Sequence, residues 1–189
     1  MHPAGSVIVF TVASGLGFGL LTWLGIGLPE VRGWVAFWHY ALGFSLAGGG
    51  LLASTFHLGN PQRFLMAFSQ WRSSWLSREG CLAVAALAVL GLFAIGKIFL
   101  EANWQVLGYL GAILAVLTVF ATSMIYAQLK TVPRWNHWST PALFLLLSLS
   151  GGGLLAAQIL PSMILLALAG ALQLAAWLSG DGRFESRGT

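Results

Sequence analysis

Charged side chains are scarce in this sequence. Of its 189 residues, 9 are Lys or Arg and 5 are Asp or Glu, so 7% are charged, whereas a soluble globular domain carries roughly 25%. Hydrophobic residues make up 58% of the chain. This composition excludes an ordinary soluble domain and predicts an integral membrane protein. The net charge of +4 rests on so few groups that it does not indicate a nucleic-acid partner.

Cysteine and a basic start are also lacking. Because Cys81 is the one cysteine, no internal disulfide can form and no cysteine-ligated iron–sulfur cluster can be held. Any such cluster is expected in a partner. The start, MHPAGSVIVF, has no Lys or Arg ahead of its long apolar run, unlike a secretory signal peptide. We therefore expect this first segment to be retained.

Long hydrophobic runs dominate what is present. A helix that spans a membrane needs about 20 mostly apolar residues. Six runs approach that length, namely 6–28, 33–56, 80–100, 104–129, 139–160 and 162–178. The sequence thus predicts an all-α, polytopic transmembrane helix bundle over residues 1–178, followed by a loose polar tail at 179–189. Only Pro161 separates the last two runs, where it marks a tight turn or a kink.

The basic residues predict an orientation, because Lys and Arg accumulate in cytoplasmic loops. The connections 57–79 and 130–138 and the tail 179–189 together contain seven of them, and the N-terminus has none. The connections expected at the opposite face contain only Arg32 and Lys97. We therefore expect both termini and the connection 57–79 to face the cytoplasm.

A nearly identical stretch occurs twice in the sequence. Residues 45–53 read SLAGGGLLA and residues 148–156 read SLSGGGLLA, on the second and fifth predicted spans. Spans three apart run in opposite directions, so the pair fits an inverted repeat of three plus three helices. Small residues also let helices approach closely, and either reason accounts for the pattern.

Three polar residues gather at one predicted membrane face. The stretch HLGNPQRF (57–64) contains His57 and Arg63, and SREG (77–80) contains Glu79. A histidine can hydrogen-bond a quinone carbonyl, an arginine can polarise its oxygen, and a glutamate can exchange a proton with it. These residues predict a quinone site, with His57 and Glu79 as the catalytic pair and Arg63 as a binding residue.

The same residues also fit simpler roles, which stay open. His57 fits an interfacial hydrogen-bonding residue, and Arg63 fits a topology charge or a partner of lipid phosphate. Glu79 fits a helix-start residue favoured by the helix dipole, or a partner of a nearby arginine. We expect Trp71, Trp75 and Tyr126 to wall the quinone pocket, although aromatic residues near span ends are also typical of the interfacial belt.

Haem and transport are the rival functions. His39 and His57 share one helix and are about 27 Å apart at 1.5 Å per residue, too far for one haem, so no haem and no metal site are expected. We expect a structural role for His39. The repeat and the glycine-interrupted helices fit a small inverted-repeat transporter. However, no acidic or basic residue lies at a convincing mid-membrane position.

The stretches HLGNPQRF, SREG and IYAQLKTVPRWNHWSTP (125–141) resemble the membrane-anchor subunits of the dimethyl sulfoxide reductase family. The start, MHPAGSVIVFTVASGLGFGLL, resembles the branch that serves sulfite dehydrogenases. The resemblance runs over most of the sequence. It implies a bacterial inner-membrane complex in which the metal cofactors belong to a molybdenum catalytic subunit and a ferredoxin-like iron–sulfur subunit.

In that resemblance the anchor exchanges electrons with ubiquinone or menaquinone and carries no haem. The family's quinol-site histidine, arginine and glutamate correspond to His57, Arg63 and Glu79. Family anchors usually have about eight spans, and six are found here. The cytoplasmic orientation predicted for the connection 57–79 favours a cytoplasmic sulfite-oxidising partner. The alternative is an anchor of a dimethyl sulfoxide-type reductase, which oxidises quinol.

Overall fold

The computed structural model describes residues 5–55, 68–100, 102 and 104–186, and side chains at 6, 54, 55 and 179–186 are excluded from the description. Within these limits every regular element is a helix, which confirms the predicted all-α class. The elements are α1 (Gly5–Gly25), α2 (Gly33–Thr55), α3 (Trp75–Ile95), a π-helical continuation of α3 called η2 (Gly96–Leu100), α4 (Gln105–Ala127), α5 (Ser139–Leu155) and α6 (Ile159–Ser186).

Five of these helices are long and apolar enough to cross a membrane. They are α1, α2, α3 with η2, α4 and α6, while α5 is apolar but has only 17 residues. The predicted sixth span was the short one, at 162–178. The structure instead gives the longest helix there, with 28 residues. The helix α6 continues through Ser186, so the expectation of a loose tail is wrong for 179–186; no proline interrupts the helix there.

The break between α5 and α6 lies before Pro161, at residues 156–158. Ala157 adopts a left-handed φ of 56°. The backbone N–H of Gln158 donates to the Gly153 carbonyl at 2.8 Å, and that of Ala157 to the Leu154 carbonyl at 3.0 Å. These two bonds form a Schellman motif, which ends α5. Pro161 then falls in the first turn of α6, where a proline costs no hydrogen bond.

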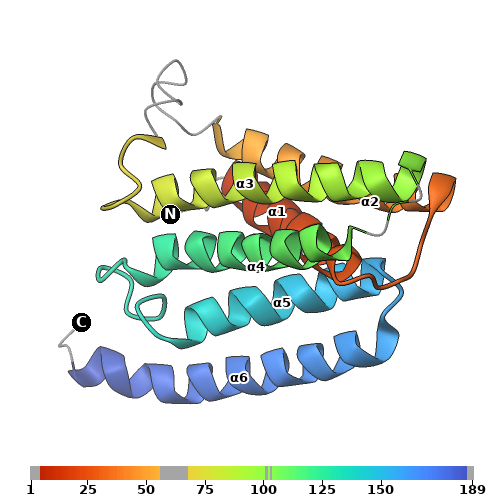
Figure 1. Cartoon of the computed structure of the whole chain (residues 1–189). Coiled ribbons are helices and arrows are strands. Elements are labelled where there is room, and N and C mark those ends of the chain that lie inside the picture. The colour runs from red at the N-terminus through yellow and green to blue at the C-terminus, as the bar shows by residue number, and fades with distance from the viewer. Residues whose placement is uncertain (1–4, 56–67, 101, 103, 187–189) are drawn as a thin grey trace.

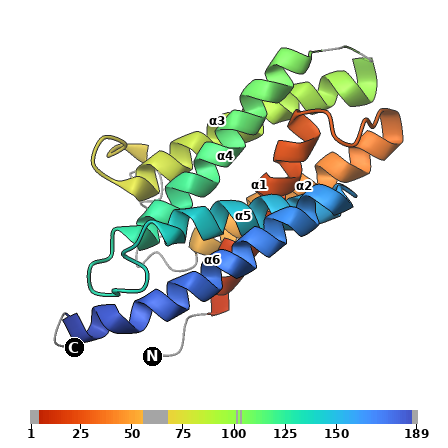
Figure 2. The ribbon, with the colours of Figure 1, turned by 90° about the horizontal axis from the view of Figure 1, so that it is seen from below.

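The helix α1 is the centre of the bundle. It packs against α2, α4 and α5, while α3 pairs with α4 and α6 lies along the outer side of α5. Figure 2 shows the same outer pairs from below. Two side chains also tie α1 to its neighbours: Trp23 Nε1 donates to the Leu149 carbonyl at 2.8 Å, and Gln105 Nε2 donates to the Gly25 carbonyl at 2.8 Å.

The two glycine-rich stretches meet α1 on different sides. A Cβ built on Gly50 of α2 would lie 2.5 Å from the backbone nitrogen of Ser14, and one built on Gly152 of α5 would collide with the backbone of Gly19. Close helix approach therefore accounts for both stretches. The packing of α1 on α5 has no counterpart of comparable extent between α4 and α2 in the described residues. The inverted repeat stays a prediction.

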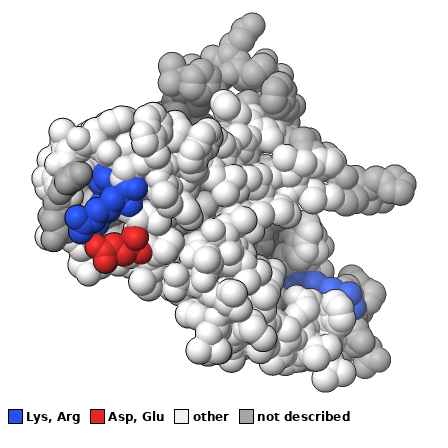
Figure 3. Space-filling view, turned by 90° about the vertical axis from the view of Figure 1, so that its right-hand side faces the viewer, with Lys and Arg blue, Asp and Glu red and all other residues white. Residues whose placement is uncertain are grey.

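The connections divide the bundle into two ends. The long-connection end contains both termini and the connections 56–74 and 128–138 (Figure 1). The short-connection end contains 26–32, 101–104 and 156–158. Figure 3 faces this second end and shows a mostly uncharged surface with one patch where basic and acidic side chains meet. Arg32 and Glu30 form an exposed ion pair there, at 3.0 Å.

The close approach of α1 and α2 predicts opposite effects at two adjacent glycines. Gly50→Ala should destabilise the fold by about 1–3 kcal/mol, because the added methyl group meets rigid backbone. Gly49→Ala is the matched control, since nothing lies within 4 Å of its Cβ position. It should be neutral or stabilise by up to about 1 kcal/mol. Thermal unfolding in mild detergent measures both, and equal effects would contradict the packing.

Candidate functional site

The structure places four of the six site residues predicted from the sequence. Glu79 and Trp75 lie on α3, Tyr126 lies on α4, and Trp71 lies in the connection before α3. All four are near the long-connection end. His57 and Arg63 lie outside the described residues, so their positions relative to the other four stay a prediction.

Glu79 is buried one full turn inside α3. The helix begins at Trp75, five residues before the predicted start of the span at 80. The interpretation of Glu79 as a helix-start residue is therefore wrong, because the dipole effect falls off within the first turn. The side chain is only 3% exposed. A carboxyl group so buried needs a hydrogen-bond partner.

Thr122 of α4 is that partner. Its hydroxyl oxygen lies 2.6 Å from Glu79 Oε1 and 3.0 Å from the backbone carbonyl oxygen of Thr118. When Glu79 is ionised, the hydroxyl donates to the carboxylate. When Glu79 is protonated, its O–H can donate to Thr122, whose hydroxyl then donates to the Thr118 carbonyl. Each group keeps a partner in both states, so the pair suits a carboxyl that gains and loses a proton while buried.

Arg78, next to Glu79 in sequence, bonds elsewhere. Its Nε donates to the Trp71 carbonyl at 2.9 Å and its terminal nitrogen to the Arg72 carbonyl at 2.6 Å. Its guanidinium also stacks on the Trp75 ring at 4.3 Å. Arg78 thus fixes the connection onto the start of α3 and does not act as the ionic partner of Glu79.

The aromatic residues expected around the pocket have different surroundings. Trp71 is 57% exposed. Trp75 meets the Phe120 ring edge-on at 6.0 Å, beneath Arg78. Tyr126 lies one helical turn beyond Thr122 on α4 and interacts electrostatically with Glu79. Of the three, Tyr126 is therefore the one that the described contacts bring to Glu79.

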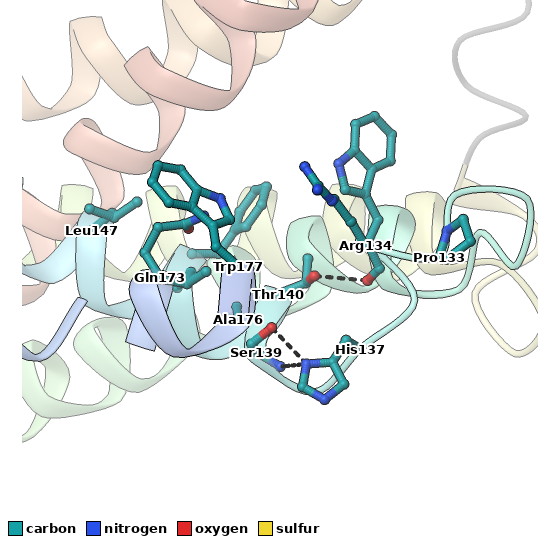
Figure 4. Close-up of a pocket in the computed structure, with 12 residues that line it drawn as sticks. Pro133, Arg134, His137, Ser139, Thr140, Leu147, Gln173, Ala176 and Trp177 are labelled. Carbon is teal, nitrogen blue, oxygen red and sulfur yellow. Dashed lines mark hydrogen bonds between the residues drawn. The ribbon is translucent and has the colours of Figure 1, made fainter. Parts of the chain in front are cut away.

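A cavity that the sequence reasoning missed lies beside this group. It has a volume of about 330 Å³ and lies between the connection 128–138, α5 and α6 (Figure 4). Its polar lining residues are Arg134, His137, Ser139, Thr140 and Gln173. A glutamine within an otherwise apolar span was the signal available in the sequence, because polar side chains in membrane helices are costly and often functional.

The described histidines do not form a metal site. No group of three or more His, Cys, Asp or Glu side chains that could hold a metal ion occurs among the residues described. His39 hydrogen-bonds the Val35 carbonyl of its own helix through Nδ1, at 2.8 Å. It lies on the first turns of α2, at the short-connection end, whereas His137 is at the other end.

Comparison with known proteins gives a family match over almost the whole sequence. The model of a family described as "DMSO reductase anchor subunit (DmsC)" matches residues 1–179. The protein is 35% identical to the C subunit of a sulfite dehydrogenase from Allochromatium vinosum over 178 residues, which cover 83% of this chain and 55% of that protein. No solved structure matches.

Two proteins of Escherichia coli K12 are also similar, and both belong to anaerobic dimethyl sulfoxide reductases. Identity to the first, YnfH, is 33% over 172 residues, or 82% of this chain and 56% of that protein. Identity to the second, the C protein of its reductase, is 32% over 128 residues, or 66% of this chain and 42% of that protein. The sequence thus spans about half the length of the curated relatives it matches.

Proposed function

The protein belongs to the DMSO reductase anchor subunit (DmsC) family, and from this membership we propose that it links a molybdenum-containing oxidoreductase to the quinone of the bacterial inner membrane. Its partners would be a molybdenum catalytic subunit and a ferredoxin-like iron–sulfur subunit. Electrons would pass between the iron–sulfur clusters and ubiquinone or menaquinone. Reduction of one quinone takes up two electrons and two protons, and oxidation of the quinol releases them.

The observation that supports this proposal most strongly is the Glu79–Thr122 pair. Quinone chemistry at a membrane edge needs a group that exchanges protons without leaving the bundle. Among the described residues, Glu79 is the one Asp, Glu, Lys or Arg whose side chain is buried. Its hydrogen bond with Thr122 works in both protonation states. We assign Glu79 to proton transfer, His57 to hydrogen bonding of the quinone carbonyl, and Arg63 to positioning the headgroup.

The position of Glu79 also bears on the transporter alternative. A translocation path needs polar groups near the middle of the membrane. Glu79 lies instead in the second turn of α3, close to the long-connection end. The connections 56–74 and 128–138 are at this same end, and they offer a docking surface for the iron–sulfur subunit. An electron donor docked there would approach the quinone from the side on which Glu79 handles protons.

The direction of electron flow follows from the partner. Similarity to a protein of a sulfite dehydrogenase and the basic residues of the long-connection end support a cytoplasmic partner that oxidises sulfite and passes electrons to quinone. The second candidate is an anchor of a dimethyl sulfoxide-type reductase that draws electrons from quinol, supported by the similarity to YnfH. Both use the same anchor site.

Substitution of the site residues should separate quinone chemistry from the reaction at the molybdenum centre. In the purified complex, Glu79→Gln should lower quinone-linked turnover by about 100-fold or more, because a positioned proton-transfer group contributes roughly 10²–10⁴-fold. His57→Ala should lower it as well. Turnover with a soluble redox dye, which bypasses the anchor, should stay unchanged and also reports intact assembly.

The matched control is Glu30→Gln, an exposed glutamate at the short-connection end, which should leave both activities intact. Full quinone-linked turnover in Glu79→Gln and His57→Ala would contradict the assignment. Loss of dye-linked activity together with quinone-linked activity would indicate a role in assembly instead.

The proposed orientation has a separate test. With the long-connection end in the cytoplasm, a green fluorescent protein fused after Thr189 should fluoresce, and alkaline phosphatase fused there should be inactive. Fusions within the connection 26–32 should give the opposite pattern. Active phosphatase after Thr189 would reverse the orientation and favour a periplasmic catalytic partner.

A further inference from the structure

The cavity beside α5 and α6 has the walls of a site for a flat ring. Trp135 from the connection, Phe144 from α5 and Trp177 from α6 all line it. Its volume of about 330 Å³ lies at the lower end of the roughly 300–1,000 Å³ typical of small-molecule sites. Figure 4 shows residues of the connection and residues of α6 converging on it from different directions.

Hydrogen-bond donors are placed among these aromatic walls. The Ser139 backbone N–H and hydroxyl both approach His137 Nδ1, at 3.3 and 2.8 Å. Because a backbone N–H only donates, Nδ1 accepts, and the neutral imidazole therefore has its proton on Nε2. His137 is thus set as a donor through Nε2, and Gln173 and Arg134 add further N–H groups to the lining. A quinone has two carbonyl oxygens that accept such bonds.

An apolar hollow continues from the cavity along the bundle. This second hollow, of about 210 Å³, lies between α1 and α5 and shares Phe144 and Leu147 with the first. Val12 and Leu16 of α1 line it as well. A polar-edged cavity joined to an apolar groove matches a molecule with a polar ring and a hydrocarbon tail.

The cavity is also connected to the buried carboxyl group. The Tyr126 ring packs against Trp135 at 5.5 Å and against Phe144 at 5.5 Å, and both of these residues line the cavity. On its other side Tyr126 interacts electrostatically with Glu79. Tyr126 is therefore the wall between the cavity and the Glu79–Thr122 pair.

We propose that this cavity holds the quinone headgroup, with the ring among Trp135, Phe144 and Trp177 and the isoprenoid tail in the groove between α1 and α5. This inference rests on the proposed function and gives its substrate a place. A phospholipid headgroup fits less well, because Arg134 is the one basic side chain in the lining and a phosphate favours several donors of positive charge. Tyr126 is a positioning residue between the ring and Glu79.

Photolabelling locates the headgroup directly. The purified complex is irradiated with an azido-substituted quinone bearing a short isoprenoid tail, with and without excess unlabelled quinone, and labelled peptides are mapped by mass spectrometry. We expect labelling within 133–147 and 173–177 that the unlabelled quinone suppresses. Suppressible labelling confined to other parts of the protein would overturn the cavity assignment while leaving the proposed function intact. No suppressible labelling anywhere in the protein would count against both.

A cavity-filling variant with a neighbouring control distinguishes the site from general contact with membrane quinone. Ala176 lines the cavity, whereas Ala175 is exposed on α6 and does not line it. Ala176→Trp should reduce suppressible labelling and raise the KM for quinone by about tenfold, and Ala175→Trp should change either by less than about twofold. Dye-linked turnover should be unchanged in both variants.

Gln173→Leu removes a donor without adding bulk, so it tests the site even if Ala176→Trp fails to assemble. It should raise the KM for quinone and leave dye-linked turnover intact. Unchanged KM in Gln173→Leu, together with unchanged labelling in an assembled Ala176→Trp complex, would overturn the proposal.

Discussion

Helices in a lipid bilayer gain little from burying apolar side chains against each other, because the lipid tails are equally apolar. Their arrangement depends on close packing and on a few polar contacts. In this protein α1 meets that constraint for the whole bundle, since it packs on α2, α4 and α5. The glycines at 50 and 152 bring the neighbouring backbones into contact with it. The α1-to-α4 contact in turn fixes the helix that presents Thr122 to Glu79.

The functional residues follow from this frame. The pairing of α3 with α4 places a carboxyl group and a hydroxyl group 2.6 Å apart where water is excluded. One turn further along α4, Tyr126 reaches both this pair and the aromatic wall of the cavity. The proton-exchanging group and the proposed ring site thus lie at the same end of the bundle, next to the two long connections. Proton and electron transfer can then meet near one membrane surface.

The sequence predicted much of the fold, because membrane spans are recorded in composition and length. Family membership could also be predicted, from HLGNPQRF, SREG and the stretch 125–141, and the family match confirms it. Helix ends were less predictable. The start of α3 at Trp75 lies in a polar stretch that hydropathy does not count, and the turn at 156–158 uses Ala157 in a left-handed conformation that no local signal announced.

The candidate site was only partly predictable, for a related reason. Glu79 stands out as a rare charge, but its partner Thr122 is 43 residues away and is an ordinary hydroxyl residue within a span. The cavity is assembled from three elements that are distant in sequence, so only packing brings them together. Infrared difference spectroscopy of the purified complex, between its quinone and quinol states, tests the central role of Glu79. A carboxylic C=O band should change on reduction, shift in Thr122→Val and vanish in Glu79→Gln; an identical band in Glu79→Gln would contradict the account.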